Sequence, residues 1–208
     1  EYGHAEHSVL SNAAQPWETA GYSTFIAETA SIMNEMLLQD MVIAEATTDQ
    51  EKLFYLGIGL EALRGTFFRQ TMFAEFELKI NEEVESGNVL TGAKLTSIYL
   101  QLLKRYHGHE QGVITIDDLY GIEWAYIPHF YYDFYVFQYA TSIAAASDLA
   151  QKIRTGDQQV QQDFINLLKA GGSDYPYELM KSAGIDMSTA APYRALIERM
   201  NGIMDQME

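Results

Sequence analysis

The chain has 208 residues, of which 48% are hydrophobic and only 4 are proline, so it can bury a substantial core and extended disorder is excluded. Its 29 acidic and 13 basic residues give a net charge of −16, which would repel a phosphate backbone and excludes nucleic acid as a partner. No cysteine is present, which excludes disulfides and thiolate ligands, and no run of about 18 apolar residues predicts a membrane span.

The first two predicted helices carry the residues of greatest chemical interest. The stretch "EYGHAEHSVLSNA" predicts a short helix that ends before Pro16. From Thr24 onward, apolar residues recur at intervals of three and four, which predicts a helix with one buried face. These positions are Phe25, Ile26, Ile32, Met33, Met36 and Leu37.

A long helix is predicted next, beginning at the sequence "TDQE". This is a capping box, in which the Thr48 hydroxyl accepts from an amide three residues on and Glu51 reaches back. No strong stop occurs before "ESGN" at 85–88, and glycines such as Gly65 allow a bend.

The remaining segments complete an all-α prediction. A helix from Thr91 to Tyr106 has Gly108 as its stop, and the β-branched alternation at 113–116 predicts at most one short strand. A long helix is then expected from Pro128 to Gly156. Three shorter helices follow, separated by turns at 170–176 and 183–188.

Glu1 and His4 lie one turn apart on the same face of the first predicted helix. If a histidine preceded Glu1, it would stand one turn before His4, and two imidazoles could then bind one Zn²⁺ while Glu1 reaches the attacking water. Without that histidine, Glu1 and His4 are only a carboxylate and an imidazole on one helical turn.

Glu28 is a carboxylate in an otherwise apolar turn of the second helix, and Glu35 follows on the same face. A buried carboxylate is unfavourable unless it is paired or bound to metal, so Glu28 is the best candidate for a third zinc ligand. Glu35 could orient a ligand imidazole. The alternative is that both carboxylates are solvated at the edge of the apolar face.

The segment "IPHFYYDFYVFQYA" at 127–140 combines one histidine with several tyrosines. Tyr132, Tyr135 and Tyr139 recur at helical spacing, and His129 precedes them by one turn. Phenol and imidazole groups can donate to a developing oxyanion, as peptide hydrolysis requires. The alternative is an aromatic core stripe with a satisfied histidine.

These pieces, in this order, resemble the C-terminal catalytic part of the M3 family of zinc metallopeptidases, in its oligoendopeptidase F branch. The matching stretches are "EYGHAEHS" at 1–8, "FIAETASIMNEMLL" at 25–38, "FRQTMFAEFE" at 68–77, "IPHFYYDFYVFQYAT" at 127–141 and "GGSDYPYELMKSAGIDM" at 171–187. The resemblance implies the multi-helix catalytic half of a zincin-like (HExxH) enzyme. Residues 1–208 would then form a single helical catalytic domain that lacks the N-terminal half and the first zinc-ligand histidine.

The resemblance also implies roles for individual residues. His4 and Glu28 would be zinc ligands, and Glu1 would be the general base. His129 and Tyr135 would approach the scissile carbonyl, and Tyr132 is the next candidate for this role. The turn containing Gly171, Gly172 and Ser173 resembles the family's glycine-rich loop near the substrate channel.

The implied activity is zinc-dependent cleavage of short oligopeptides by a cytoplasmic endopeptidase. The isolated chain is expected to bind zinc weakly, to be inactive, and to self-associate through a face that contacts the missing half. Two alternatives remain. One is a non-catalytic helical fragment or pseudo-enzyme, and the other is a di-iron carboxylate protein, although that site needs two E-x-x-H motifs and the chain has one.

Overall fold

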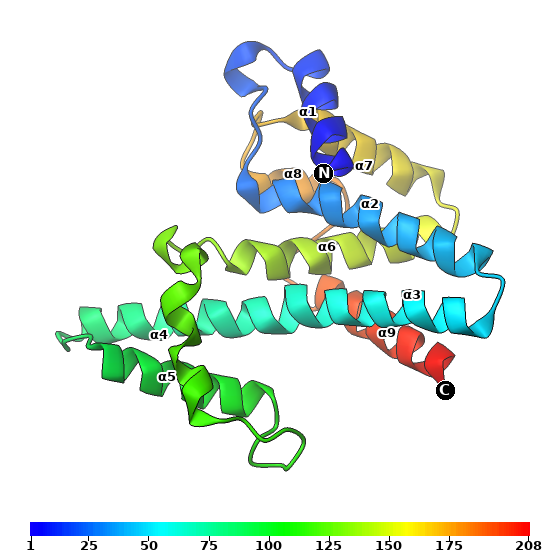
Figure 1. Cartoon of the computed structure of the whole chain (residues 1–208). Helices are drawn as coiled ribbons and strands as arrows, with labels where there is room; N and C mark the ends of the chain where they lie inside the picture. Colours follow the sequence, from blue (N-terminus) through cyan, green and yellow to red (C-terminus); the bar gives the residue numbers. More distant parts are fainter. The chain divides into compact units, whose positions relative to one another are not determined.

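The computed structural model describes residues 1–208 and is helical, with nine α-helices and no β-strand (Figure 1). The all-α prediction is therefore confirmed. Two compact units are present, one made of Glu1–Phe67 with Thr141–Glu208 and the other of Phe68–Ala140. None of the helices combines the length and apolar character needed to cross a membrane.

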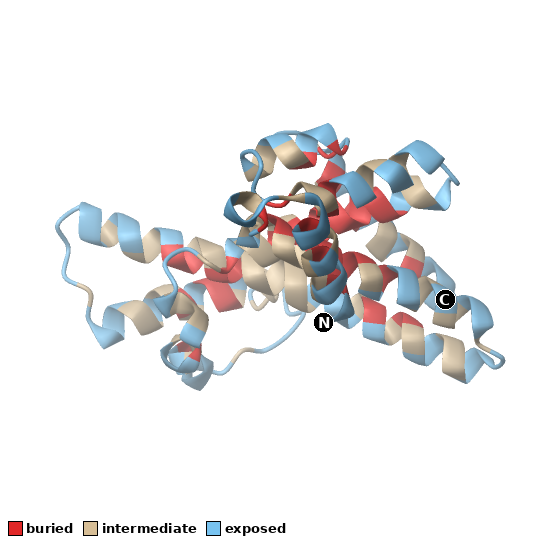
Figure 2. Ribbon diagram, turned by 90° about the horizontal axis from the view of Figure 1, so that it is seen from above, coloured by how far each residue is buried: buried red, intermediate tan, exposed pale blue.

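The first unit is organised around one central helix. Its elements are α1 (Tyr2–Ala14), α2 (Thr24–Glu45), α3 (Asp49–Leu63), most of α6 (Phe137–Arg154), α7 (Gln158–Ala170), α8 (Pro176–Ser182) and α9 (Ala191–Met207). Helix α1 packs on α2 and α7, while α3 packs on α2 and α9. Every α6 residue from Ser142 to Ala150 is buried (Figure 2). A helix buried all round favours apolar or small residues, as in the run Ala144–Ala146, and the one charged residue of the buried segment, Asp148, forms an ion pair with Lys152.

The second unit contains α4 (Gln70–Glu85), α5 (Gly92–Tyr106) and two 3₁₀ segments, Asp118–Tyr126 and Pro128–Tyr131. Helices α4 and α5 pack together, and the first 3₁₀ segment packs on α5. The core consists of Met72, Phe73, Phe76, Tyr99, Leu102, Leu103, Ile127 and Val136. This unit therefore has a core of its own, with Phe73, Phe76 and Tyr99 as its buried aromatic residues.

The long helix predicted over 48–85 is present, with one irregularity. The Thr48 hydroxyl accepts from the Glu51 amide at 3.2 Å, as the capping box requires. The Glu51 carboxylate reaches back one residue further than predicted, to the Thr47 amide at 2.9 Å. A π-helical turn at Arg64–Arg69, which contains Gly65, separates α3 from α4 where a bend was allowed.

The short strand allowed at 113–116 is absent. Gly108 and Gly112 both have positive φ, of 65° and 73°, and form successive turns after α5. Val113 and Ile114 are exposed, and no other extended segment lies beside them. β-Branched residues alone do not form a strand, because strand stability comes from cross-strand partners.

The helix predicted from Pro128 begins nine residues later, at Phe137. A 3₁₀ turn takes up Pro128–Tyr131, and Asp133 and Phe134 then adopt left-handed φ values of 52° and 56°. Two consecutive left-handed residues end any right-handed helix, so the helical spacing assumed for Tyr132 and Tyr135 was wrong.

Candidate functional site

His4 and Glu28 lie side by side in the first unit. His4 is on α1 and Glu28 is on α2, and the distance from His4 Nε2 to Glu28 Oε2 is 3.5 Å. The side chains are partly open to solvent, with exposed fractions of 32% and 23%. The two residues predicted as metal ligands, from helices 24 positions apart in sequence, are thus brought together.

Gly3 allows this close approach of the two helices. A Cβ atom on Gly3 would lie 2.5 Å from the carbonyl oxygen of Ala30 and 2.6 Å from Cα of Ser31. Any larger residue would force α1 away from α2. Gly3 directly precedes His4, and Ala30 lies two residues after Glu28. The contact between Gly3 and Ala30 therefore sets how near the side chains of His4 and Glu28 come.

The geometry of this pair fits a zinc ion. Two ligands at about 2.0–2.1 Å from a tetrahedral Zn²⁺ are about 3.3–3.5 Å apart, and imidazole with carboxylate is a common ligand pair. No cluster of three or more His, Asp or Glu side chains suited to a metal is present in the chain. His4 and Glu28 would therefore account for two of the ligands of such an ion.

Glu1 stands at the N-cap of α1, where its side chain makes no capping hydrogen bond and is exposed. Its backbone carbonyl accepts from the Ala5 amide at 3.1 Å, which places Glu1 one turn before His4 on the same helix. The carboxylate is therefore open to solvent.

Two residues that the sequence analysis overlooked support His4. The His7 ring is buried and stacks on Tyr22, with ring centroids 3.5 Å apart and an interplanar angle of 10°. The Tyr22 hydroxyl hydrogen-bonds with Ser8 Oγ at 2.8 Å and donates to the His4 carbonyl at 3.4 Å. Burial, reinforced by His4, lowers the pKa of His7 to about 4, so this ring is neutral at pH 7. The signal in the sequence was His7 itself, one turn beyond His4.

The predicted glycine loop packs on the connection between α1 and α2. Gly171 has φ 55°, and a Cβ there would collide with the Thr19 carbonyl oxygen. The Gly172 amide donates to the same carbonyl at 2.8 Å. Ser173, next in the turn, is exposed. The loop is therefore fixed to the segment that joins the two helices carrying His4 and Glu28.

In the second unit, the predicted aromatic residues form one cluster. The His129 ring lies 5.9 Å from the rings of both Tyr132 and Tyr135, measured between centroids, and 6.1 Å from Tyr139. The Tyr139 hydroxyl donates to the Tyr135 hydroxyl at 3.3 Å. Tyr132 is 58% exposed, whereas His129 and Tyr135 are partly buried. The four rings therefore lie together, although the helical spacing expected for Tyr132 and Tyr135 is absent.

Glu35 is exposed on α2, and no hydrogen bond or ion pair joins it to His4. It lies at the edge of a cleft of about 370 Å³ between α2 and α3. Apolar side chains on these two helices are exposed, namely Leu37, Leu38, Met41, Leu53, Phe54 and Ile58. We call this set the α2/α3 apolar face.

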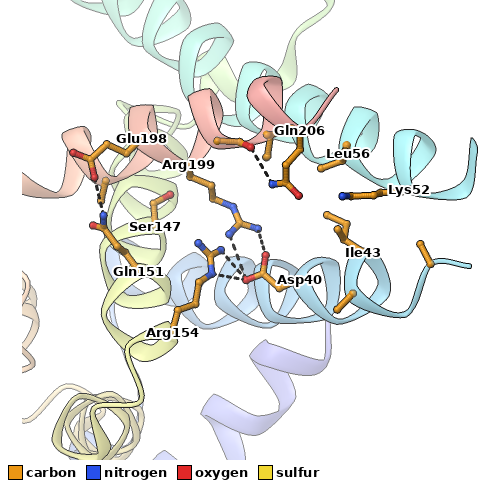
Figure 3. Close-up of a pocket in the computed structure, with 15 residues that line it drawn as sticks. Asp40, Ile43, Lys52, Leu56, Ser147, Gln151, Arg154, Glu198, Arg199 and Gln206 are labelled. Carbon is orange, nitrogen blue, oxygen red and sulfur yellow. Dashed lines mark hydrogen bonds and ion pairs between the residues drawn. The ribbon is translucent and has the colours of Figure 1, made fainter. Parts of the chain in front are cut away.

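A second, charged cavity of about 680 Å³ lies between α2, α3, α6 and α9 (Figure 3). Asp40 lines this cavity and forms ion pairs with Arg154 at 2.7 Å and with Arg199 at 3.0 Å. The Arg199 side chain is only 6% exposed and also donates to Gln39 Oε1 at 2.8 Å. These ion pairs join three helices of the first unit.

Comparison with known proteins agrees with the helical fold. The model of "Peptidase family M3" matches residues 1–199. Oligopeptidase PepF of Bacillus subtilis (strain 168) is 41% identical over 208 residues, which are 100% of this chain and 31% of that protein. Group B oligopeptidase PepB of Streptococcus agalactiae is 42% identical over 206 residues, covering 96% of this chain and 33% of that protein.

Among solved structures, the crystal structure of oligoendopeptidase-F from Enterococcus faecium matches with a TM-score of 0.82 and 36% identity, covering 99% of this chain and 37% of that one. The chain belongs to peptidase family M3, with oligoendopeptidase F proteins among its relatives, and it spans about a third of the length of the curated relatives it matches.

Proposed function

We propose that this chain is the metal-carrying part of a zinc-dependent endopeptidase that cleaves short oligopeptides. The observation that carries the proposal is the 3.5 Å approach of His4 Nε2 to Glu28 Oε2, within the span expected for two ligands of one tetrahedral metal ion. Membership of family M3 supports it. His4 and Glu28 would hold the ion, with a third ligand from the residue before Glu1 in the longer protein.

When bound, zinc would polarise the peptide carbonyl and make water acidic enough to attack near neutral pH. Glu1 takes the proton of the attacking water and then delivers it to the departing amine. His129 and Tyr135, assisted by Tyr132, donate hydrogen bonds to the developing oxyanion. The loop at Gly171, Gly172 and Ser173 contacts the bound peptide.

The proposed partner of the α2/α3 apolar face is the rest of the family-length protein. Exposed apolar side chains on neighbouring helices offer a surface that another part of a protein can cover. With two metal ligands and an uncovered apolar face, the isolated 208-residue polypeptide binds zinc weakly, self-associates and has little peptidase activity. We place the intact enzyme in the cytoplasm, where short unstructured peptides are its substrates.

Metal analysis of the full-length gene product tests the proposal. We expect one zinc per chain and cleavage of short peptides, with His4→Ala and Glu28→Ala both losing zinc and activity. Glu35→Gln, on the same helix as Glu28, is the matched control and keeps both. Two irons per chain, or full zinc occupancy in both Ala variants, would overturn the assignment of His4 and Glu28.

A further inference from the structure

Glu77 is a buried carboxylate that no step of the proposed reaction uses. It lies on α4 in the second unit, is only 3% exposed, and closes the sequence "FRQTMFAEFE". Its Oε1 accepts from the Phe134 amide at 3.2 Å, and the Val136 amide also interacts favourably with its carboxylate. Its Oε2 has no partner. A carboxylate buried this far needs a reason, because desolvation of its charge is unfavourable.

The segment that Glu77 holds is strained. Asp133 and Phe134 have φ values of 52° and 56°, and both are non-glycine residues in the left-handed region. Consecutive left-handed residues of this kind are rare, and they persist only where surrounding contacts impose them. They also remove the following amides from any helical ladder, so those amides need another acceptor.

This strained turn separates Tyr132 from Tyr135, the two tyrosines of the aromatic cluster. On either side, the chain is anchored by apolar side chains. Phe130 packs against Phe73 and Phe76 of α4, with ring centroids 5.2 and 5.0 Å apart, and Val136 is fully buried. Between these two apolar anchors, the Phe134 amide is hydrogen-bonded to Glu77, which lies one turn beyond Phe73 on α4.

We propose that Glu77 is a positioning residue for the aromatic cluster: its carboxylate holds the left-handed turn at Asp133 and Phe134 and thereby fixes Tyr135 beside His129 and Tyr132. It acts through these residues and does not touch substrate. An ionised carboxylate accepts backbone amides more strongly than a neutral amide side chain does, which accounts for Glu rather than Gln here. The inference rests on the proposed peptidase function only for its effect on turnover.

The pKa of Glu77 reflects both the burial of its carboxylate and the backbone amides that the carboxylate faces. Burial, with a contribution from Asp133, raises its pKa, whereas the backbone amides of Phe134 and Val136 act in the opposite direction. A residue needed only to fill space in the aromatic core would be apolar.

Amide hydrogen exchange on the full-length gene product provides the first test. In the wild-type protein, the Phe134 amide should be protected because it donates to a buried carboxylate, and the Val136 amide because Val136 is fully buried and interacts with the same carboxylate. Exchange of both amides at the rate of an unstructured chain would refute the positioning role. This measurement needs no variant and no peptidase activity.

The second test compares Glu77→Gln with Glu82→Gln, an exposed glutamate on the same helix. For Glu77→Gln, exchange of the two amides should accelerate about 10-fold, and kcat should fall about 10- to 100-fold with KM little changed, since the donors act in the transition state. Glu82→Gln should alter neither. Adding Phe134→Gly to Glu77→Gln should restore part of both losses, because glycine adopts positive φ without strain.

The outcomes separate the two proposals. Unchanged exchange and kcat in Glu77→Gln, or no restoration by Phe134→Gly, would overturn the positioning role. If Glu77→Gln does not fold, the wild-type exchange rates decide. If the wild-type protein has no peptidase activity, the proposed function fails, and exchange still decides whether Glu77 holds the turn.

Discussion

Gly3 of α1 and Ala30 of α2 are in backbone contact, so close that a Cβ on Gly3 would lie 2.5 Å from the Ala30 carbonyl oxygen. Gly3→Ala should force the helices apart, lower the free energy of unfolding by about 1–3 kcal/mol and weaken zinc binding at least about tenfold. Urea unfolding and a zinc competition titration on the full-length gene product measure the two effects.

The control for Gly3→Ala is Gly57→Ala, because Gly57 is also helical and a Cβ there meets nothing within 4 Å. This change should stabilise the protein by about 0.5–1 kcal/mol and leave zinc affinity alone. Unaltered zinc affinity in Gly3→Ala would show that the helix contact does not set the ligand spacing.

Glu1→Gln should keep zinc and lose nearly all turnover, since the side chain retains its size but can no longer accept a proton. Zinc content by mass spectrometry and kcat on a short peptide are the two measurements. Glu6→Gln provides the comparison, because Glu6 is an exposed glutamate on the same helix that hydrogen-bonds only Asn34. Robust turnover by Glu1→Gln would remove Glu1 from the role of general base.

Stability should depend on pH through His7. The pKa of His7 is lowered from 6.5 to about 4 by burial and by His4, so between these values the unfolded chain binds more protons than the folded one. Stability is therefore fully present above about pH 6.5 and falls as the pH drops toward 4, by on the order of 2–3 kcal/mol. Urea unfolding at several pH values measures the loss.

His7→Phe keeps a ring against Tyr22 but cannot titrate, so this part of the pH dependence should disappear. An unchanged pH profile in His7→Phe would mean that the loss of stability in acid arises elsewhere in the chain.

Asp40 neutralises two arginines, one of which, Arg199, has a side chain that is 6% exposed. Asp40→Asn should lower the free energy of unfolding by about 2 kcal/mol, because it leaves a buried cation without its charged partner. Glu198→Gln is matched to it, since Glu198 lines the same cavity but bonds only the Gln151 amide, and it should cost less than about 0.5 kcal/mol. Equal effects of the two variants would contradict the importance of the Asp40 ion pairs.

Much of this molecule could be predicted from sequence, and the failures have physical causes. The pairing of His4 with Glu28 followed from two helices whose apolar faces and motif residues are local features of the sequence. The break at Asp133 and Phe134 could not be foreseen, because two consecutive left-handed non-glycine residues are rare and the turn contacts Glu77, more than 50 positions away. For the same reason, the start of α6 was placed too early.

His7 could be read from the sequence, but no local pattern gave it a role. Its role depends on the stacking of Tyr22, which comes from the segment before α2. The absent strand at 113–116 is a similar case, because β-branched residues indicate a strand only where a partner exists. Long-range contacts therefore determined each feature that local patterns missed.

Helix α6 also limits which sequences this fold can accept. Ala144, Ala145 and Ala146 have no exposed surface, so three consecutive side chains point in different directions and each meets a neighbour. Replacing any of them with valine or leucine would add volume where none is free, and no single compensating change could make room on all three sides. Variation in this chain should accordingly concentrate on the surfaces of α5 and α7, while positions 144–146 of α6 stay confined to small residues such as alanine, serine and glycine.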